Sequence, residues 1–218
     1  MFKNHFKEIL LKLPKIALSI ALAALCLAGC DSGKEQKNAI APTESKTGEK
    51  KVLVAYFSIY GNTQKIAERV QQELGADLLR IETVKEYPNN PERYKELTEI
   101  GKEEVDNEIL PELKPIDKNL KEYDVVIVGT PTWWSTAAPA VMSFLKSFNL
   151  SGKTMCFFAT HGSGPGSVIT DMQKACNGAN PGPSLEIEFA FPANGQVLTS
   201  EDTINAWINE LKTLIGKN

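Results

Sequence analysis

Three short runs of unbroken apolar residues constrain the fold of this chain more than any other feature of its sequence. They are residues 52–57 (VLVAYF), 125–128 (VVIV) and 155–159 (MCFFA). Both faces of a strand are apolar when both faces of its sheet are covered, so these runs predict three central strands. Residues 79–83 and 185–189 alternate apolar with charged residues, which is typical of strands with one solvated face. With these two segments at the edges, the strand order is 2-1-3-4-5.

Segments with the apolar spacing of helices separate these expected strands. They cover residues 66–74, which end at Gly75, and residues 141–148 and 204–215. The alternation predicts an α/β domain, a doubly wound five-stranded parallel sheet with helices on both faces. In such a domain the ligand crevice lies at the carboxyl ends of strands 1, 3 and 4. Trp207 lies on the apolar stripe of the last helix, so we expect it in the core.

The connection between the second and third expected strands is longer than one helix requires. Residues 91–109 within it form a charged stretch with helical spacing. We expect the following apolar side chains of this helix to face inward: Tyr94, Leu97, Val105 and Ile109.

The first 29 residues have the composition of an export signal. Four Lys residues accompany an apolar stretch, residues 16–27, that is too short to span a bilayer, which takes ~20 residues. The stretch ends in Leu-Ala-Gly-Cys, which resembles the bacterial lipobox and implies that Cys30 is lipidated and becomes the first mature residue. Asp31 resembles an inner-membrane retention signal, so we expect an anchor on the outer face of the bacterial cytoplasmic membrane. The alternative is an ordinary secretory peptide that ends in Cys.

The rest of the chain is acidic and divides into two parts. Residues 1–29 hold four of the 24 Lys and Arg residues but one of the 27 Asp and Glu residues, so the mature chain would carry a net charge of -6. We therefore expect no nucleic-acid partner. Residues 30–50 are almost entirely polar and cannot form a core, which predicts a flexible tether. Residues 51–218 then form one domain.

A candidate phosphate site follows the first expected strand. Residues 58–63, Ser-Ile-Tyr-Gly-Asn-Thr, lead directly into a helix. The unpaired N–H groups and positive dipole end of a helix N-terminus favour an anion, and Gly61 lets the backbone turn around it. The absence of a Lys from this segment weighs against a nucleoside-triphosphate loop. A capped turn without a ligand is the alternative.

Two more polar loops follow the third and fourth expected strands. Trp133 and Trp134 are adjacent in the first of these loops, so their side chains cannot both point into the same core. We therefore expect at least one of them to be exposed or to line the crevice. An indole there would offer a stacking platform to a flat aromatic ligand, unless both side chains pack the loop onto the sheet. Residues 160–167 are rich in glycine, and their N–H groups could meet the edge of a heterocycle.

Taken together and in this order, these segments resemble those of the flavodoxins, and in particular the flavodoxin-like proteins of anaerobic bacteria, some of which are exported lipoproteins. The matching motifs are YFSxxGNT, GTPTWW, the Pro and Phe-Leu pattern of the next helix, SGKT before THGSG, and residues 87–97 of the long connection. The resemblance covers residues 51 to about 216. It implies a flavodoxin-like fold with FMN as the cofactor.

The resemblance also implies roles for thirteen residues of this chain. The FMN phosphate would be held by Ser58, Tyr60, Gly61, Asn62 and Thr63. The isoalloxazine would be lined by Pro131, Thr132, Trp133 and Trp134, with either indole stacking on it. Its pyrimidine edge would meet Thr160, His161, Gly162 and Ser163.

Two positions depart from the flavodoxin pattern. Ser135 replaces the usual Gly after the second aromatic residue, which would hinder a backbone flip toward the flavin, and His161 replaces the second stacking Tyr of short flavodoxins. Since the three loops contain no Asp or Glu, a cationic His161 would favour the reduced, anionic flavin. The alternative role of His161 is a hydrogen bond that stabilises its loop.

The resemblance implies a membrane-tethered electron-transfer protein that exchanges electrons with redox partner proteins. The alternatives are an FMN-dependent oxidoreductase that takes hydride from NAD(P)H and reduces quinones or other small acceptors, and a flavin-free module for another phosphorylated ligand. We expect no catalytic side chain and no metal site. An exported domain is oxidised, yet a helix and a sheet pack ~10 Å apart and a disulfide needs Cα atoms within ~7 Å. Cys156 and Cys176 are therefore expected to be buried thiols, with a disulfide as the alternative.

Overall fold

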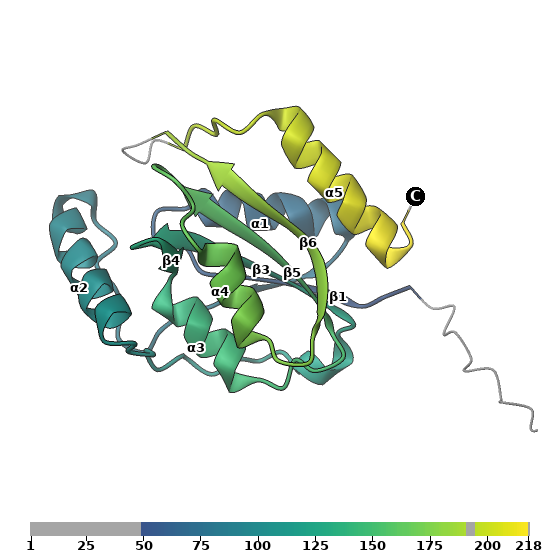
Figure 1. The fold of residues 1–218 in the computed structure, drawn as a ribbon, viewed down its shortest axis with the longest axis horizontal. Coiled ribbons are helices and arrows are strands. Elements are labelled where there is room, and N and C mark those ends of the chain that lie inside the picture. The colour runs from purple at the N-terminus through teal and green to yellow at the C-terminus, as the bar shows by residue number, and fades with distance from the viewer. Residues whose placement is uncertain (1–48, 191–194, 218) are drawn as a thin grey trace, which may run out of the picture. The chain divides into compact units, whose positions relative to one another are not determined.

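The computed structural model describes residues 49–190 and 195–217, which form a layered α/β domain (Figure 1). The expected export signal, Cys30 and all but the last two residues of the tether lie outside the described residues. The parallel strands are β1 (Val52–Tyr56), β2 (Asp77–Arg80), β3 (Val125–Trp133), β5 (Thr154–His161) and β6 (Asn180–Glu188). Their order is β2-β1-β3-β5-β6, which confirms the predicted order of the five main strands.

A sixth, two-residue strand was not predicted. β4 (Thr136–Ala137) pairs antiparallel with the end of β3, where Trp133 faces Thr136 and Thr132 faces Ala137. Two residues are too few to show a period of two, so the sequence carried no signal for this strand. The pairing turns the chain back sharply at the carboxyl edge of the sheet.

Helices cover both faces of the sheet (Figure 1). α1 (Asn62–Leu74) and α5 (Glu201–Ile215) pack on one face, and α3 (Pro139–Ser147) and α4 (Val168–Ala175) on the other. α1 ends at Gly75, whose φ of 59° lies in the left-handed region that favours glycine. Trp207 is buried in the core beneath α5, as predicted. Among the residues that the structure describes, no helix is long and apolar enough to cross a bilayer.

α2 (Tyr94–Asp106) lies at the border of the domain, after the 3₁₀ turn η1 (Pro91–Arg93) and before a second such turn, η2 (Leu120–Glu122). In Figure 1 it stands apart from the helices on the two faces, on the side of β4. Its inward stripe is narrow, because Leu97 and Gly101 are its buried residues. Two predictions for this helix were wrong, since Tyr94 and Ile109 are 44% and 42% exposed. Ile109 lies beyond the helix, which ends at Asp106 rather than at residue 109. Tyr94 is the first residue of α2, and a helix that packs against the end of a strand covers less of its surface than one lying flat on the sheet.

The sheet separates the two cysteines of the domain. Cys156 belongs to the core beneath α1 and α5, and Cys176 to the core beneath α3 and α4. Both are free thiols, which confirms the prediction and leaves no room for the disulfide. Burial raises the pKa of the Cys156 thiol to about 12 and that of Cys176 to about 11, because a thiolate is poorly solvated there.

Candidate functional site

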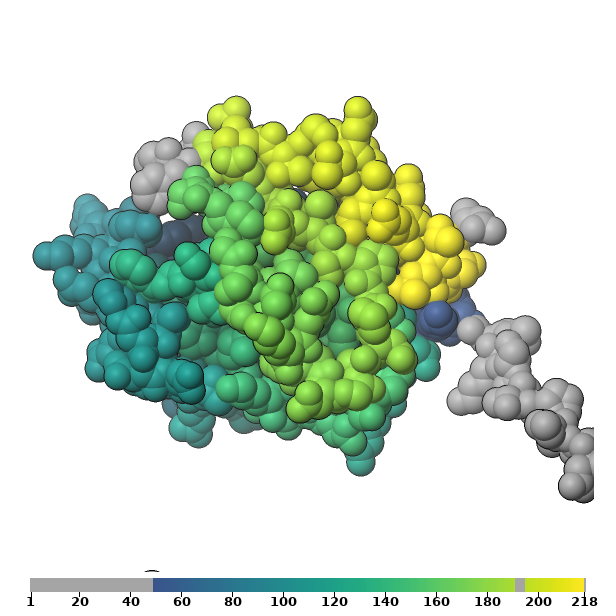
Figure 2. All heavy atoms as spheres, in the orientation of Figure 1, coloured from purple at the N-terminus to yellow at the C-terminus, as the bar shows by residue number. Residues whose placement is uncertain are grey.

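A cavity of about 560 Å³ opens at the carboxyl edge of the sheet. Figure 2 shows the surface hollowed between the teal atoms of α2 and the green atoms of the segment after β5. The segment after β1, the carboxyl ends of β3 and β5 and the turns after them line it, together with α2 and the chain after β6. Twelve of the thirteen predicted site residues line this cavity, and the exception is Gly61. The structure therefore brings the three loops together, while their contacts with a ligand stay a prediction.

The loop after β1 presents the bare N-terminus of α1 to the cavity. Gly61 precedes the helix with a φ of 92°, and no side chain caps the helix start. The Gly61 N–H donates instead to Ser58 Oγ at 3.1 Å, which holds the loop closed. No acidic residue lies in the first turn of α1, so the positive end of the helix dipole is not offset from within the helix. This geometry suits an anion.

Thr63 ties this loop to the third one. Its Oγ1 lies 2.8 Å from Thr160 Oγ1, and both side chains are buried. Either hydroxyl can be the donor, so the accepting one keeps its own proton for a second partner. Asn62 and the backbone of the first helical turn are the other groups of this loop that could meet a ligand.

The two tryptophans have different environments. Trp133 is half-buried and packs edge-on against Phe57 and Tyr87, with ring centroids 5.7 and 5.1 Å away. A methyl group at Gly101 would lie 3.0 Å from the Trp133 ring, so α2 closes over that indole. Trp134 is 52% exposed on the cavity rim. The prediction that at least one indole would be exposed or line the crevice is confirmed.

Trp134 is fixed to α2 despite its exposure. Its Nε1–H donates to the Thr98 carbonyl at 3.2 Å, and the Lys102 ammonium lies 5.5 Å from the centre of its ring. The φ angles of Trp134 and Ser135 are 50° and 65°, a conformation that costs free energy in residues other than glycine. Ser135, which replaces the usual Gly of flavodoxins, therefore adopts a backbone conformation that favours Gly.

His161 holds its own loop. Its Nδ1 accepts a hydrogen bond from the Gly164 N–H at 3.2 Å. With Nδ1 as the acceptor in this contact, Nε2 is the ring nitrogen left to meet another group. The structure shows the loop-stabilising hydrogen bond, one of the two roles expected for His161.

Two buried hydroxyls on the cavity wall have no partner. Tyr60 Oη and Thr132 Oγ1 are buried without a hydrogen bond within the described part of the chain. A buried hydroxyl without a partner is costly, and neither oxygen is exposed to the cavity in this structure. Neither Asp nor Glu is among the described residues that line the cavity.

Several lining residues were not predicted as site residues. Three of them belong to the predicted loops, whereas α2 contributes residues of which Tyr94 and Leu97 were expected to face inward. Placing these required knowing where α2 docks. The full set is Ile59, Tyr94, Leu97, Thr98, Gly101, Ser135, Gly164, Phe189 and Ala190.

Comparison with known proteins places this site in a family. Residues 51–211 match the family model described as flavodoxin. The chain belongs to the flavodoxin family. This match spans the sheet, all three loops and most of α5. The resemblance found in the loops is thereby confirmed, while the lipoprotein subgroup is untested by this match.

Solved structures of other flavoproteins are similar to this one. A flavoprotein of Bacteroides eggerthii is 28% identical over 78% of this chain and 99% of its own, with a TM-score of 0.61. One of Bacteroides uniformis is 27% identical over 74% and 99%, with a TM-score of 0.62. A Lactobacillus acidophilus flavoprotein solved in complex with FMN is 21% identical over 63% and 93%, with a TM-score of 0.54. The last shares the fold.

Proposed function

We propose that this flavodoxin binds FMN in the cavity at the carboxyl edge of its sheet and transfers electrons between partner proteins. One observation carries the proposal: an uncapped helix N-terminus, an exposed indole and a glycine-rich turn line a single cavity without acidic lining among the described residues. A phosphate, a flat ring and a polar edge are the three parts of FMN that such a set of groups fits. The volume lies within the range of ordinary cofactor sites.

The first loop would hold the phosphate. The N–H groups of the first turn of α1 and the side chain of Asn62 point to an anion at this end of the cavity. Tyr60 Oη has no partner in the described residues and is buried, so it would become a donor to the phosphate only after its side chain moves. Ser58 acts indirectly, since its Oγ fixes the Gly61 turn.

The second and third loops would hold the ring. Lys102 occupies one side of the Trp134 indole, so stacking would use the other face. The glycine-rich turn after His161 would meet polar atoms of the ring edge. His161 would donate through Nε2, because Nδ1 is committed to Gly164.

FMN, when bound, supplies the one- and two-electron chemistry of the flavin. The contribution of the chain is to bind it, to keep one edge in reach of a partner and to set its surroundings. The absence of acidic lining among the described residues removes one source of repulsion toward a negatively charged ring. We therefore propose a flavin that is reduced more readily than in flavodoxins with acidic surroundings.

The cofactor proposal is tested by adding FMN to the purified full chain and recording visible absorption and flavin fluorescence. We expect stoichiometric binding with quenched fluorescence. Trp134→Ala should weaken binding about tenfold, the upper end of what an aromatic contact contributes. A preparation that ignores FMN would instead support the flavin-free binding module.

The carrier role is tested by steady-state oxidation of NADH and NADPH. An electron carrier should oxidise both slowly and should accept electrons from a reductase supplied in trans. Rapid turnover by the chain alone, with quinone as acceptor, would favour the oxidoreductase alternative.

We also propose that the domain is exported and anchored to the outer face of the bacterial cytoplasmic membrane through lipid on Cys30. The support is the sequence of the first 31 residues, with its basic start, short apolar stretch and Leu-Ala-Gly-Cys end. Membrane fractionation of cells that express wild type and Cys30→Ala tests it. The variant should leave the membrane fraction or fail to be processed, and unchanged fractionation would contradict the anchor.

A further inference from the structure

We propose that Arg80 is a positioning residue that also supplies the positive charge of the phosphate site, an inference that rests on the proposed binding of FMN. The chain has three Arg residues. Arg69 and Arg93 form ion pairs with Glu201 and Glu96 at 2.8 and 2.6 Å. Arg80 is in none of the ion pairs found among the described residues, and its charge is therefore not neutralised by a contacting carboxylate.

The guanidinium of Arg80 contacts the phosphate loop instead. Its two terminal nitrogens donate to the Ser58 carbonyl at 3.1 Å and to Gln64 Oε1 at 3.4 Å. Ser58 is at the start of the loop, and Gln64 is in the first turn of α1. Arg80 therefore bridges the two ends of the segment that surrounds the bare helix N-terminus.

The sheet register places Arg80 there. It is the last residue of β2 and pairs with Tyr56, the last residue of β1. The loop leaves β1 directly after this pair, so the side chain at this register position reaches it. Gln64 is oriented for the contact, because its Nε2 donates to Glu68 Oε1 at 2.7 Å and leaves its Oε1 to accept from Arg80.

A bound phosphate monoester is stabilised by a nearby positive charge. It carries about -1.5 to -2 charges at neutral pH, whereas a helix N-terminus offers roughly half a positive charge. Neither Lys nor Arg is among the described residues that line the cavity. Arg80, one hydrogen bond behind the loop, is the cation in contact with the phosphate site, although solvent screens part of its effect because it is exposed.

The test compares FMN with riboflavin, which lacks the phosphate, as ligands of the full chain. We expect Arg80→Gln to weaken FMN about fivefold or more at low salt, the size expected for one screened charge. Riboflavin affinity should change less than twofold. Arg80→Lys keeps the charge and should retain more FMN affinity than Arg80→Gln. Added NaCl should weaken FMN more in wild type than in Arg80→Gln.

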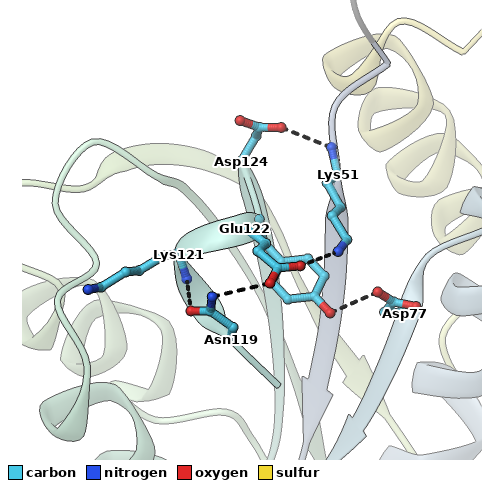
Figure 3. A network of polar contacts seen from close by, with 7 residues as sticks. Lys51, Asp77, Asn119, Lys121, Glu122 and Asp124 are labelled. Atoms are coloured by element: carbon cyan, nitrogen blue, oxygen red, sulfur yellow. Dashed lines mark hydrogen bonds and ion pairs between the residues drawn. The ribbon is translucent and has the colours of Figure 1, made fainter. Parts of the chain in front are cut away.

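Lys121→Gln is the matched control, because it removes the same charge at the amino ends of the strands, away from the cavity. In Figure 3 the Lys121 backbone joins the polar network around Lys51 and Glu122 while its side chain points away from that network. This variant should leave both affinities unchanged. Thermal unfolding checks that each variant is folded.

Three results would overturn the inference. FMN affinity could be unchanged in Arg80→Gln, riboflavin could weaken as much as FMN, or Lys121→Gln could have the same effect as Arg80→Gln. Failure of the wild type to bind FMN is a separate outcome, since it would overturn the proposed function itself.

Discussion

The backbone N–H of Ser167 donates a hydrogen bond of 2.7 Å to the carbonyl oxygen of Ser135. This contact joins the turn between β3 and β4, which holds Trp134 and Ser135, to the start of α4. The same serine donates through Oγ to Asp171 at 2.5 Å, and Thr136 Oγ1 donates to the same carboxylate oxygen at 2.8 Å. The start of α4 thus fixes the backbone of Ser135, whose φ is positive.

This contact requires glycine at position 166. An added Cβ at Gly166 would lie 2.2 Å from the Ser135 carbonyl oxygen, and its φ is 64°. Gly166→Ala should lower the free energy of unfolding by about 2–4 kcal/mol, from backbone strain and overpacking together, and should weaken FMN binding. Equilibrium denaturation and FMN titration measure the two effects.

Gly152→Ala separates strain from clash. Gly152 has a φ of 77° with nothing within 4 Å of an added Cβ. Gly152→Ala should lower the free energy of unfolding by about 1–2 kcal/mol, from backbone strain alone, and should keep wild-type FMN affinity. Equal effects of the two variants on both properties would contradict the role given to the Ser135–Ser167 contact.

Glu104 should make stability depend on pH. Tyr87, which packs against Trp133, donates to Glu104 Oε2 at 2.6 Å. Burial raises the pKa of the Glu104 carboxyl above its usual range, and the tyrosine hydrogen bond opposes this without cancelling it. A raised pKa means that the fold favours the protonated acid, so its stabilising contribution is present at low pH and is lost as the pH rises through the folded-state pKa.

The measurement is the denaturation midpoint between pH 4 and 7.5. Relative to Glu104→Gln, wild type should lose stability as the pH rises. Glu103→Gln, at the neighbouring exposed position, should follow wild type. A constant difference between wild type and Glu104→Gln across this range would show that the carboxyl is not perturbed.

The two buried thiols should be unreactive in the folded chain. Their raised pKa values leave almost no thiolate at pH 8. Iodoacetamide followed by peptide mass spectrometry should modify Cys156 and Cys176 only after denaturation, with or without prior reduction. A disulfide-linked peptide pair from the native protein would contradict the position of the two cysteines on opposite sides of the sheet.

Gly129 is the tightest position of the central strand. An added Cβ would lie 2.1 Å from Cζ of the buried Phe158 ring on the neighbouring strand. Gly129→Ala should therefore lower the free energy of unfolding by about 1–3 kcal/mol. Combining it with Phe158→Leu should cost less than the sum of the two single changes, and an additive result would show that the ring is not the obstacle.

The sequence carried the sheet and the convergence of the loops, because both follow from local patterns. Unbroken apolar runs mark strands covered on both faces, and the carboxyl ends of parallel strands meet at one edge. The exposure of Tyr94 could not be predicted, because helical spacing says which residues share a face but not how much of that face is covered. Ile109 is exposed for another reason, since α2 ends at Asp106. The contact of Arg80 with the loop after β1 could not be predicted for a similar reason. The alternation of apolar and charged residues in its strand indicates that Arg80 is exposed, but it does not show which loop lies beside it.

FMN binding at the carboxyl edge of the sheet is tested most directly by a crystal structure of the full chain grown with FMN. We expect the phosphate within hydrogen-bonding distance of the backbone N–H groups at the start of α1. We expect the ring to lie between the Trp134 side chain and the turn after His161. FMN bound at another surface, or a ring that contacts neither segment, would contradict it.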